Sequence, residues 1–189
     1  RALKLLADGA QKFTSGRSRF RRSNSNQSPS VTAMIRLIAM GGAVDQLGNV
    51  GNGAEFNLAA DPEAADIVFG ADLPLTLIPL DVTRRVRAGR GDVARLSRGD
   101  ARARTAAALI EAYFQTTAGG ESRPLHDPCV MLRALEPGLF GTERRAVAPD
   151  LSRGANAGRL GPGPHGIDIA LTVDAPSALE RLLRGLGAP

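Results

Sequence analysis

The chain has 189 residues, 43% of them hydrophobic and 4% aromatic, with a single cysteine. This length allows one α/β domain with its own core, and one cysteine excludes an internal disulfide framework. The net charge of +5 arises in residues 1–36, which hold eight Lys and Arg against one acid, whereas the remainder holds 16 basic and 18 acidic residues. The slightly acidic remainder argues against a basic nucleic-acid-binding groove in the folded body.

The N-terminal segment, residues 1–30, is predicted to be a basic, flexible region rich in Ser, Asn and Arg. A short helix is expected within it at about residues 1–13. Residues 31–189 are predicted to form the α/β domain. No run of about 18 apolar residues occurs, so we expect no transmembrane helix, and the opening residues do not read as a signal peptide.

Strands alternate with helices in the predicted domain. Strands are expected at residues 31–40, 75–80 and 166–174. Helices are expected at residues 60–74, with Asp61 as its cap, at 83–96, in one piece or two, and at 100–115, 128–135 and 176–186. A glycine-rich loop is expected at 45–57. The alternation favours an open, mostly parallel sheet with flanking helices. In such sheets, ligands bind beyond the carboxyl ends of the strands.

The stretch GNVGNGAEFN, residues 48–57, is a candidate binding loop. Its glycines allow the backbone to approach a ligand closely. Asn49, Glu55 and Asn57 combine hydrogen-bond acceptors with donors, which suits recognition of vicinal hydroxyl groups. The same composition is typical of an ordinary Asx-rich surface loop, and spacing alone leaves both interpretations open.

The stretch PLHDPC, residues 124–129, contains one of the two histidines. Asp127 precedes a proline and is placed to cap a helix, but its carboxylate is also a hard ligand suited to calcium or magnesium. His126 is suited to protonating a leaving group, or else it is structural. Cys129 is expected to be a buried apolar residue, and no role is assigned to His165.

Three segments in this order resemble the inosine–uridine-preferring nucleoside hydrolase family. They are MGGAVDQLGNVGNGAEFNLAADPEAADIVF, LPLTLIPLDVT and PLHDPC. The resemblance runs from about Met34 to Leu139 and continues more weakly through LSRGANAGR and GIDIALTVD. It implies a nucleoside hydrolase-like α/β fold.

The activity that this resemblance implies is hydrolysis of the N-glycosidic bond of purine or pyrimidine ribonucleosides, giving ribose and the free base. A Ca²⁺ ion would chelate the 2′- and 3′-hydroxyls of ribose, and water would attack through an oxocarbenium-like transition state. By resemblance, Asp127 is a calcium ligand and His126 is the catalytic histidine near the leaving base. The substrate-binding residues would be Met40, Asn49, Glu55, Phe56 and Asn57.

One family feature has no counterpart in these 189 residues. Family members carry an N-terminal D-x-D-P-G-x-D-D cluster that supplies the water-activating aspartate and most calcium carboxylates, and no such motif occurs here. We therefore expect the C-terminal portion of the domain, incomplete at the N-terminus through truncation, frameshift or a gene-model error. The alternatives are a non-catalytic ribose- or nucleoside-binding remnant and a nucleic-acid-interacting protein led by the basic arm.

The expected partner is a small-molecule ribonucleoside, and a homo-oligomer, either dimer or tetramer, follows from the resemblance. Neither a membrane nor a nucleic acid is expected as the principal partner. A cytoplasmic location in nucleoside catabolism and salvage is also expected, consistent with the single cysteine.

Overall fold

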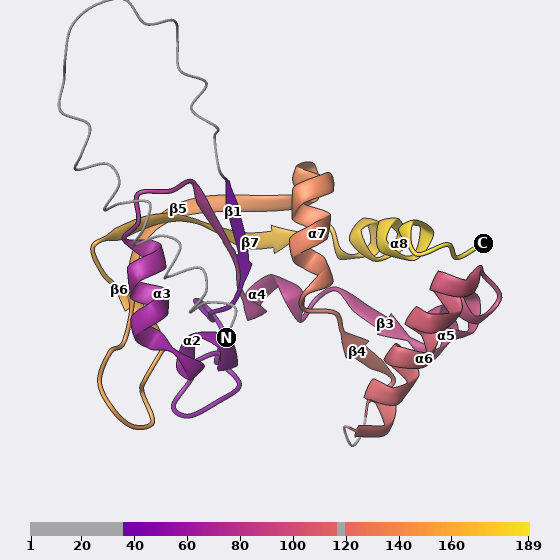
Figure 1. Cartoon of the computed structure of the whole chain (residues 1–189), viewed down its shortest axis with the longest axis horizontal. Coiled ribbons are helices and arrows are strands. Elements are labelled where there is room, and N and C mark those ends of the chain that lie inside the picture. Colours follow the sequence, from indigo (N-terminus) through magenta and orange to yellow (C-terminus); the bar gives the residue numbers. More distant parts are fainter. Residues whose placement is uncertain (1–35, 117–119) are drawn as a thin grey trace, which may run out of the picture. The chain divides into compact units, whose positions relative to one another are not determined.

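The computed structural model describes residues 36–116 and 120–189 (Figure 1). These residues divide into two compact units. Unit 1 holds residues 36–77 and Arg144–Asp168, and unit 2 holds Ile78–Glu143 and Ile169–Pro189. None of the helices within the described ranges is long and apolar enough to cross a membrane.

The central element is a five-stranded sheet with the strand order β1-β2-β7-β5-β6. Its strands are β1 (Leu37–Met40), β2 (Leu75–Ile78), β5 (Phe140–Pro149), β6 (Leu160–Pro162) and β7 (His165–Val173). The predicted class, a mostly parallel sheet with flanking helices, is confirmed. The sequence analysis missed β5 and β6, which pair antiparallel with Val147 opposite Pro162.

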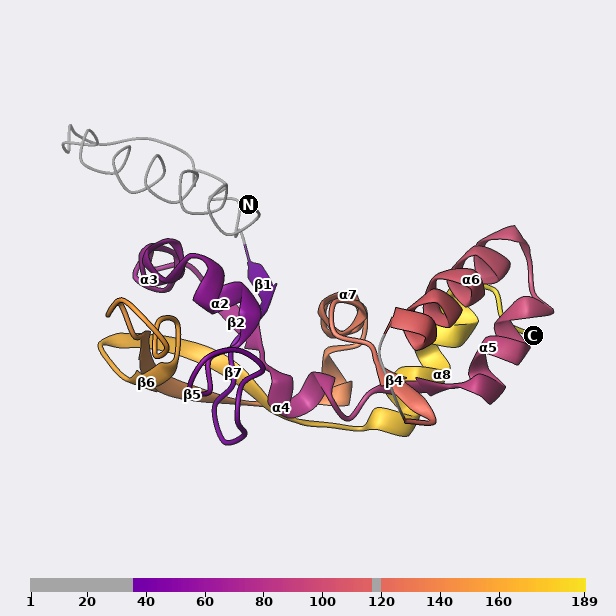
Figure 2. The ribbon, with the colours of Figure 1, turned by 90° about the horizontal axis from the view of Figure 1, so that it is seen from below.

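Two short helices of unit 1, α2 (Phe56–Ala60) and α3 (Pro62–Phe69), lie on one side of its strands (Figure 2). The start predicted for α3 is confirmed, because Asp61 Oδ1 accepts a hydrogen bond from the Ala64 amide at 3.0 Å. The prediction of a loop through residue 57 was wrong at its end, because the chain is already helical at Phe56.

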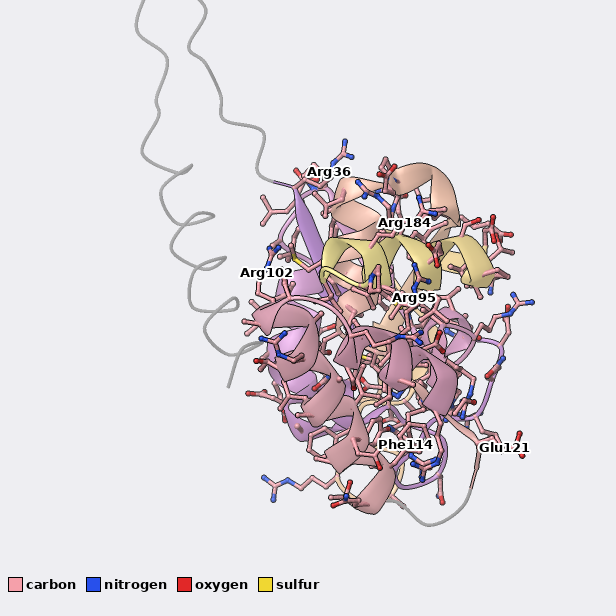
Figure 3. All side chains as sticks on the ribbon, turned by 90° about the vertical axis from the view of Figure 1, so that its right-hand side faces the viewer. Arg36, Arg95, Arg102, Phe114, Glu121 and Arg184 are labelled. Carbon is pink, nitrogen blue, oxygen red and sulfur yellow. The ribbon has the colours of Figure 1, made fainter. Side chains whose placement is uncertain are left out.

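Unit 2 is mainly helical. Its elements include α4 (Leu80–Thr83), α5 (Arg90–Ser97), α6 (Ala101–Thr116), α7 (Pro128–Leu135), the 3₁₀ turn η1 (Pro137–Leu139) and α8 (Ala175–Gly185). Helices α5, α6 and α8 share one apolar core, built from Val93, Leu96, Ala103, Ala107, Phe114 and Leu183. Arg95 on α5 reaches α8, where its guanidinium pairs with the Glu180 carboxylate (Figure 3).

A two-stranded antiparallel sheet in unit 2 replaces part of the helix predicted over residues 83–96. Strand β3 (Arg87–Gly89) pairs with β4 (Ser122–Pro124), next to α5 and α6 (Figure 1). The Arg87 guanidinium donates to Ser122 Oγ at 2.8 Å and to the Ser122 carbonyl at 2.7 Å. Ser122 lies 35 residues from Arg87 along the chain. Pairing over this distance cannot be detected from the local hydrophobic periodicity that predicted the helix.

Several N-terminal predictions fall outside the described residues. They concern the helix at residues 1–13, the flexible segment at 13–30 and the start of the first strand at 31–35. The boundary between residues 1–30 and the domain 31–189 therefore stays a prediction.

The single cysteine provides a test of the packing under α7. Cys129 is completely buried, its thiol donates to the Leu125 carbonyl, and burial raises its pKa to about 12, with the Asp127 charge acting in the same direction. The thiolate is the reactive form, so we expect no reaction with Ellman's reagent in the native chain at about pH 8. One thiol per chain should react after denaturation. Fast modification of the native chain would show that this packing is wrong.

Candidate functional site

Five residues predicted to bind substrate gather in unit 1, and we call them the Glu55 cluster: Met40, Asn49, Glu55, Phe56 and Asn57. Glu55 is the N-cap of α2, and only 2% of its surface is exposed. Its Oε2 atom accepts hydrogen bonds from the amides of Gly42, at 3.0 Å, and Leu58, at 3.3 Å. This oxygen therefore joins the turn after β1 to the first turn of α2.

The other carboxylate oxygen of Glu55, Oε1, keeps a small accessible surface. Among the described residues, no hydrogen bond reaches Oε1, and no buried side-chain oxygen or nitrogen lacks a partner. Oε1 must therefore be accessible at the surface. A carboxylate that is anchored through one oxygen and open at the other is an acceptor held in place for a ligand hydroxyl.

The two asparagines are anchored in a similar way. Asn57 donates its amide to the Met40 carbonyl, at 3.4 Å, and to Met40 Sδ, at 3.3 Å, and no described donor reaches its carbonyl oxygen. Asn49 accepts the Phe56 amide at 2.9 Å, which leaves its NH₂ group as a donor. The Phe56 ring is 61% exposed beside them. The cluster thus offers acceptors, a donor and an apolar ring.

The loop that carries Asn49 is held by distant parts of unit 1. The Asn52 amide donates to the Ala155 carbonyl at 2.7 Å, and its side chain donates to Asn156 at 3.0 Å. Gly42 has φ +81°, and a Cβ atom there would lie 2.7 Å from Leu160. The MGG motif therefore needs glycine at residue 42, both for the backbone conformation and for space.

His126 lies in unit 2, between β4 and α7. Its Nδ1 atom is 2.8 Å from Thr83 Oγ1 at the end of α4. Thr83 is completely buried, and sequence analysis gave it no role although it closes the PLDVT motif. Burial lowers the pKa of His126, and Arg84 and Arg87 lower it further against the opposing effect of Asp127.

Asp127 occupies the N-cap position of α7 but does not act as a side-chain cap. Its backbone is already in the helical region, its side chain makes no capping hydrogen bond, and the residue is exposed. The helix-cap interpretation is therefore not supported. The Asp127 residue is exposed to solvent, so of the two interpretations only the metal-ligand one is compatible with its surroundings.

The described residues do not by themselves fit a calcium site. Calcium usually takes six to eight oxygen ligands, several of them carboxylates. Within residues 36–116 and 120–189, no three His, Cys, Asp or Glu side chains group around a point where a metal ion would sit. Asp127 supplies one carboxylate and not a complete site.

The second histidine is structural in this arrangement. His165 Nε2 lies 2.8 Å from Asp66 Oδ1, which ties the start of β7 to α3 within unit 1. Its side chain is 18% exposed. This contact gives His165 a packing role that the sequence had left open.

The mostly parallel sheet with flanking helices defines an α/β protein, and the Glu55 carboxylate is anchored through one of its two oxygens. The chain belongs to the inosine-uridine preferring nucleoside hydrolase family, whose family model matches residues 25–180.

Named relatives support this assignment. The pyrimidine-specific ribonucleoside hydrolase RihA of Enterobacter sp. (strain 638) is 40% identical over 119 residues, 60% of this chain and 38% of that protein. The plant nucleoside hydrolase PpNRh1 is 28% identical, with a TM-score of 0.71 over 79% of this chain and 52% of that structure. A purine-preferring ribonucleoside hydrolase from Gardnerella vaginalis is 28% identical, with a TM-score of 0.66 over 78% and 50%. The chain thus spans two fifths to one half of these relatives' length.

Because two backbone amides donate to Glu55, we expect its substitutions to lower the free energy of unfolding, and Glu55→Ala to lower it more than Glu55→Gln. Glu55→Ala should cost about 1–3 kcal/mol for each buried amide left without an acceptor, whereas Glu55→Gln keeps a carbonyl oxygen and should cost less. Urea unfolding measures both. Glu121→Ala, at an exposed residue (Figure 3), is the control and should change stability by less than about 0.5 kcal/mol. Equal stability of all three variants would contradict the anchor.

Proposed function

We propose that this chain carries the ribose-binding and leaving-group residues of a ribonucleoside hydrolase, which cleaves the N-glycosidic bond to give ribose and the free base. The observation that carries the proposal is the Glu55 carboxylate, which is buried, held by two backbone amides and open at Oε1. The family assignment supplies the reaction. Since the chain spans only part of its relatives, the activity is a proposal for this chain.

The Glu55 cluster is proposed to hold the sugar. Glu55 Oε1 and the Asn57 carbonyl oxygen accept hydrogen bonds from ribose hydroxyls, and the Asn49 amide donates to a ribose oxygen. As the glycosidic bond breaks, positive charge develops on the anomeric carbon and the ring oxygen. A fixed carboxylate stabilises that charge because it needs no reorganisation during the reaction.

His126 is proposed to assist departure of the base. The bond between the anomeric carbon and the base nitrogen breaks, and its electron pair goes to the base. The base takes the Nε2 proton of His126 in its imidazolium form, which becomes the neutral imidazole. Water adds its oxygen to the anomeric carbon and loses a proton. The family aspartate that accepts this proton lies in the D-x-D-P-G-x-D-D motif, which has no counterpart in these 189 residues.

Asp127 is proposed as one ligand of the family's calcium ion. No step is assigned to the ion here, because the described residues do not complete its site. When bound in a full-length relative, calcium would hold ribose hydroxyls and favour ionisation of a bound water.

Base preference is not part of the proposal, because the relatives differ: RihA is named pyrimidine-specific and the Gardnerella enzyme purine-preferring. A dimeric or tetrameric state, a cytoplasmic location and a role in nucleoside salvage stay predictions. A non-catalytic ribose-binding remnant differs from the proposal only in turnover, which the second experiment below decides.

The incomplete ligand set predicts weak calcium binding. Calorimetry on the 189-residue chain should show millimolar affinity or none, since one exposed carboxylate cannot replace several water ligands of the ion. Asp127→Ala should leave this weak signal unchanged or abolish it. Micromolar binding that is lost in Asp127→Ala would show that further ligands exist.

Restoring the aspartate motif should restore turnover. The 189-residue chain alone should not hydrolyse inosine or uridine, whereas a chimera in which residues 1–33 are replaced by the matching part of the Enterobacter relative should do so with added calcium. In the chimera, Asp127→Ala should remove nearly all activity. His126→Ala should slow natural nucleosides by about 10²–10⁴-fold and p-nitrophenyl riboside much less, because its leaving group departs without a proton.

The matched control is Glu121→Ala in the same chimera, which should keep full activity. Equal losses on both kinds of substrate in His126→Ala would assign His126 to sugar positioning or packing. A folded chimera that binds ribose without turnover would favour the ribose-binding remnant. Turnover by the unmodified chain would overturn the assignment of the water-activating group to the missing motif.

A further inference from the structure

Thr83 and His126 form an isolated hydrogen-bonded pair in unit 2. The Oγ1 atom of Thr83 has one side-chain partner among the described residues, His126 Nδ1 at 2.8 Å. No hydrogen bond in the described chain reaches His126 Nε2. Because no buried side-chain nitrogen there lacks a partner, Nε2 must be accessible at the surface. The two ring nitrogens thus have different surroundings, one held by the protein and one open.

The backbone on both sides of the pair is fixed. The pairing of β3 with β4 continues through the Leu125 amide, which donates to the Val86 carbonyl at 2.8 Å. This bond places the residue after Leu125, His126, near the end of α4. The His126 carbonyl accepts the Cys129 amide at 3.1 Å, and the Thr83 amide donates to the Pro79 carbonyl at 3.2 Å. The backbone of both residues is therefore held in place independently of the contact between their side chains.

Burial decides which partner donates. If the Thr83 hydroxyl accepted a proton from Nδ1, its own hydrogen would be left without an acceptor at a residue that is completely buried. Buried donors without a partner are rarer and more costly than acceptors with a spare lone pair. The hydroxyl therefore donates to Nδ1, and the proton of the neutral imidazole resides on Nε2.

We propose that Thr83 is a positioning residue that holds His126 in the tautomer with its proton on Nε2, the nitrogen that faces outward. The inference rests on the proposed function only in its choice of histidine. It describes the resting, neutral form of His126, in which the accessible nitrogen carries the proton, whereas the form that protonates a leaving base is the imidazolium, with a proton on both nitrogens. Thr83 acts through His126 and touches no reacting atom.

Nitrogen-15 NMR of the whole chain tests the inference without any turnover. The chain has two histidines, so ¹⁵N-histidine labelling gives two imidazoles, and His165→Asn identifies the signals of His126. At about pH 8.5, above the ordinary imidazole pKa of about 6.5, Nδ1 should show the shift of an unprotonated nitrogen and Nε2 that of a protonated one. A wild-type chain with the proton on Nδ1 overturns the inference.

Three variants separate positioning from simple packing. Thr83→Val should change the tautomer ratio by about two- to tenfold toward the Nδ1–H form, the effect of losing one hydrogen bond of ordinary net strength, and Thr83→Ser should restore it. Thr76→Val, at a buried threonine of β2, should leave the His126 signals unchanged. The His165 signals report whether each variant is folded.

An unchanged ratio in folded Thr83→Val, or failure of Thr83→Ser to restore it, overturns the proposal. If Thr83→Val does not fold, a slowly exchanging Thr83 hydroxyl proton coupled to Nδ1 in the wild-type chain supports the proposal, and its absence overturns it. Should the chimera described above lack turnover while these NMR results hold, the catalytic proposal fails and the positioning of His126 stands.

Discussion

A single buried carboxylate oxygen organises unit 1. Oε2 of Glu55 accepts two backbone amides, one after β1 and one in α2, and therefore determines where the glycine-rich loop leaves the sheet and where it returns. A polar group this deeply buried persists only when it is hydrogen-bonded. The same bonds that satisfy Oε2 also fix the position of Oε1, so the loop geometry and the placement of this second oxygen depend on one interaction.

In unit 2 the buried polar side chain is a threonine, and it anchors a neighbouring histidine. Thr83 is enclosed and its hydroxyl makes one hydrogen bond, whereas its partner His126 keeps one nitrogen at the surface. In both units a polar side chain is therefore divided into an anchored atom and an open one. Polar atoms held in this way favour reactions that need charge and protons at defined positions.

The sequence predicted the features that local patterns encode. Asp61 followed by proline located the start of α3, and the family motifs identified the residues of the Glu55 cluster. It did not predict strand β3, which has three residues and a partner 35 positions away. Strand β5 was missed because exposed residues, two of them charged, fill most of its first half and hide any apolar alternation. Thr83 was missed because its role depends on a histidine 43 positions later, a contact that only tertiary structure creates.

The link between the loop at Asn52 and the segment at Ala155 and Asn156 also bears on protein synthesis. The side-chain contact spans 104 positions, and ribosomes add about 5–20 residues per second. The glycine-rich loop therefore leaves the ribosome about 5–20 seconds before its partner segment does. During that interval its phenylalanine and the Asn52 amide are available to chaperones and to neighbouring nascent chains. The order of translation therefore exposes the glycine-rich loop before the segment that restrains it.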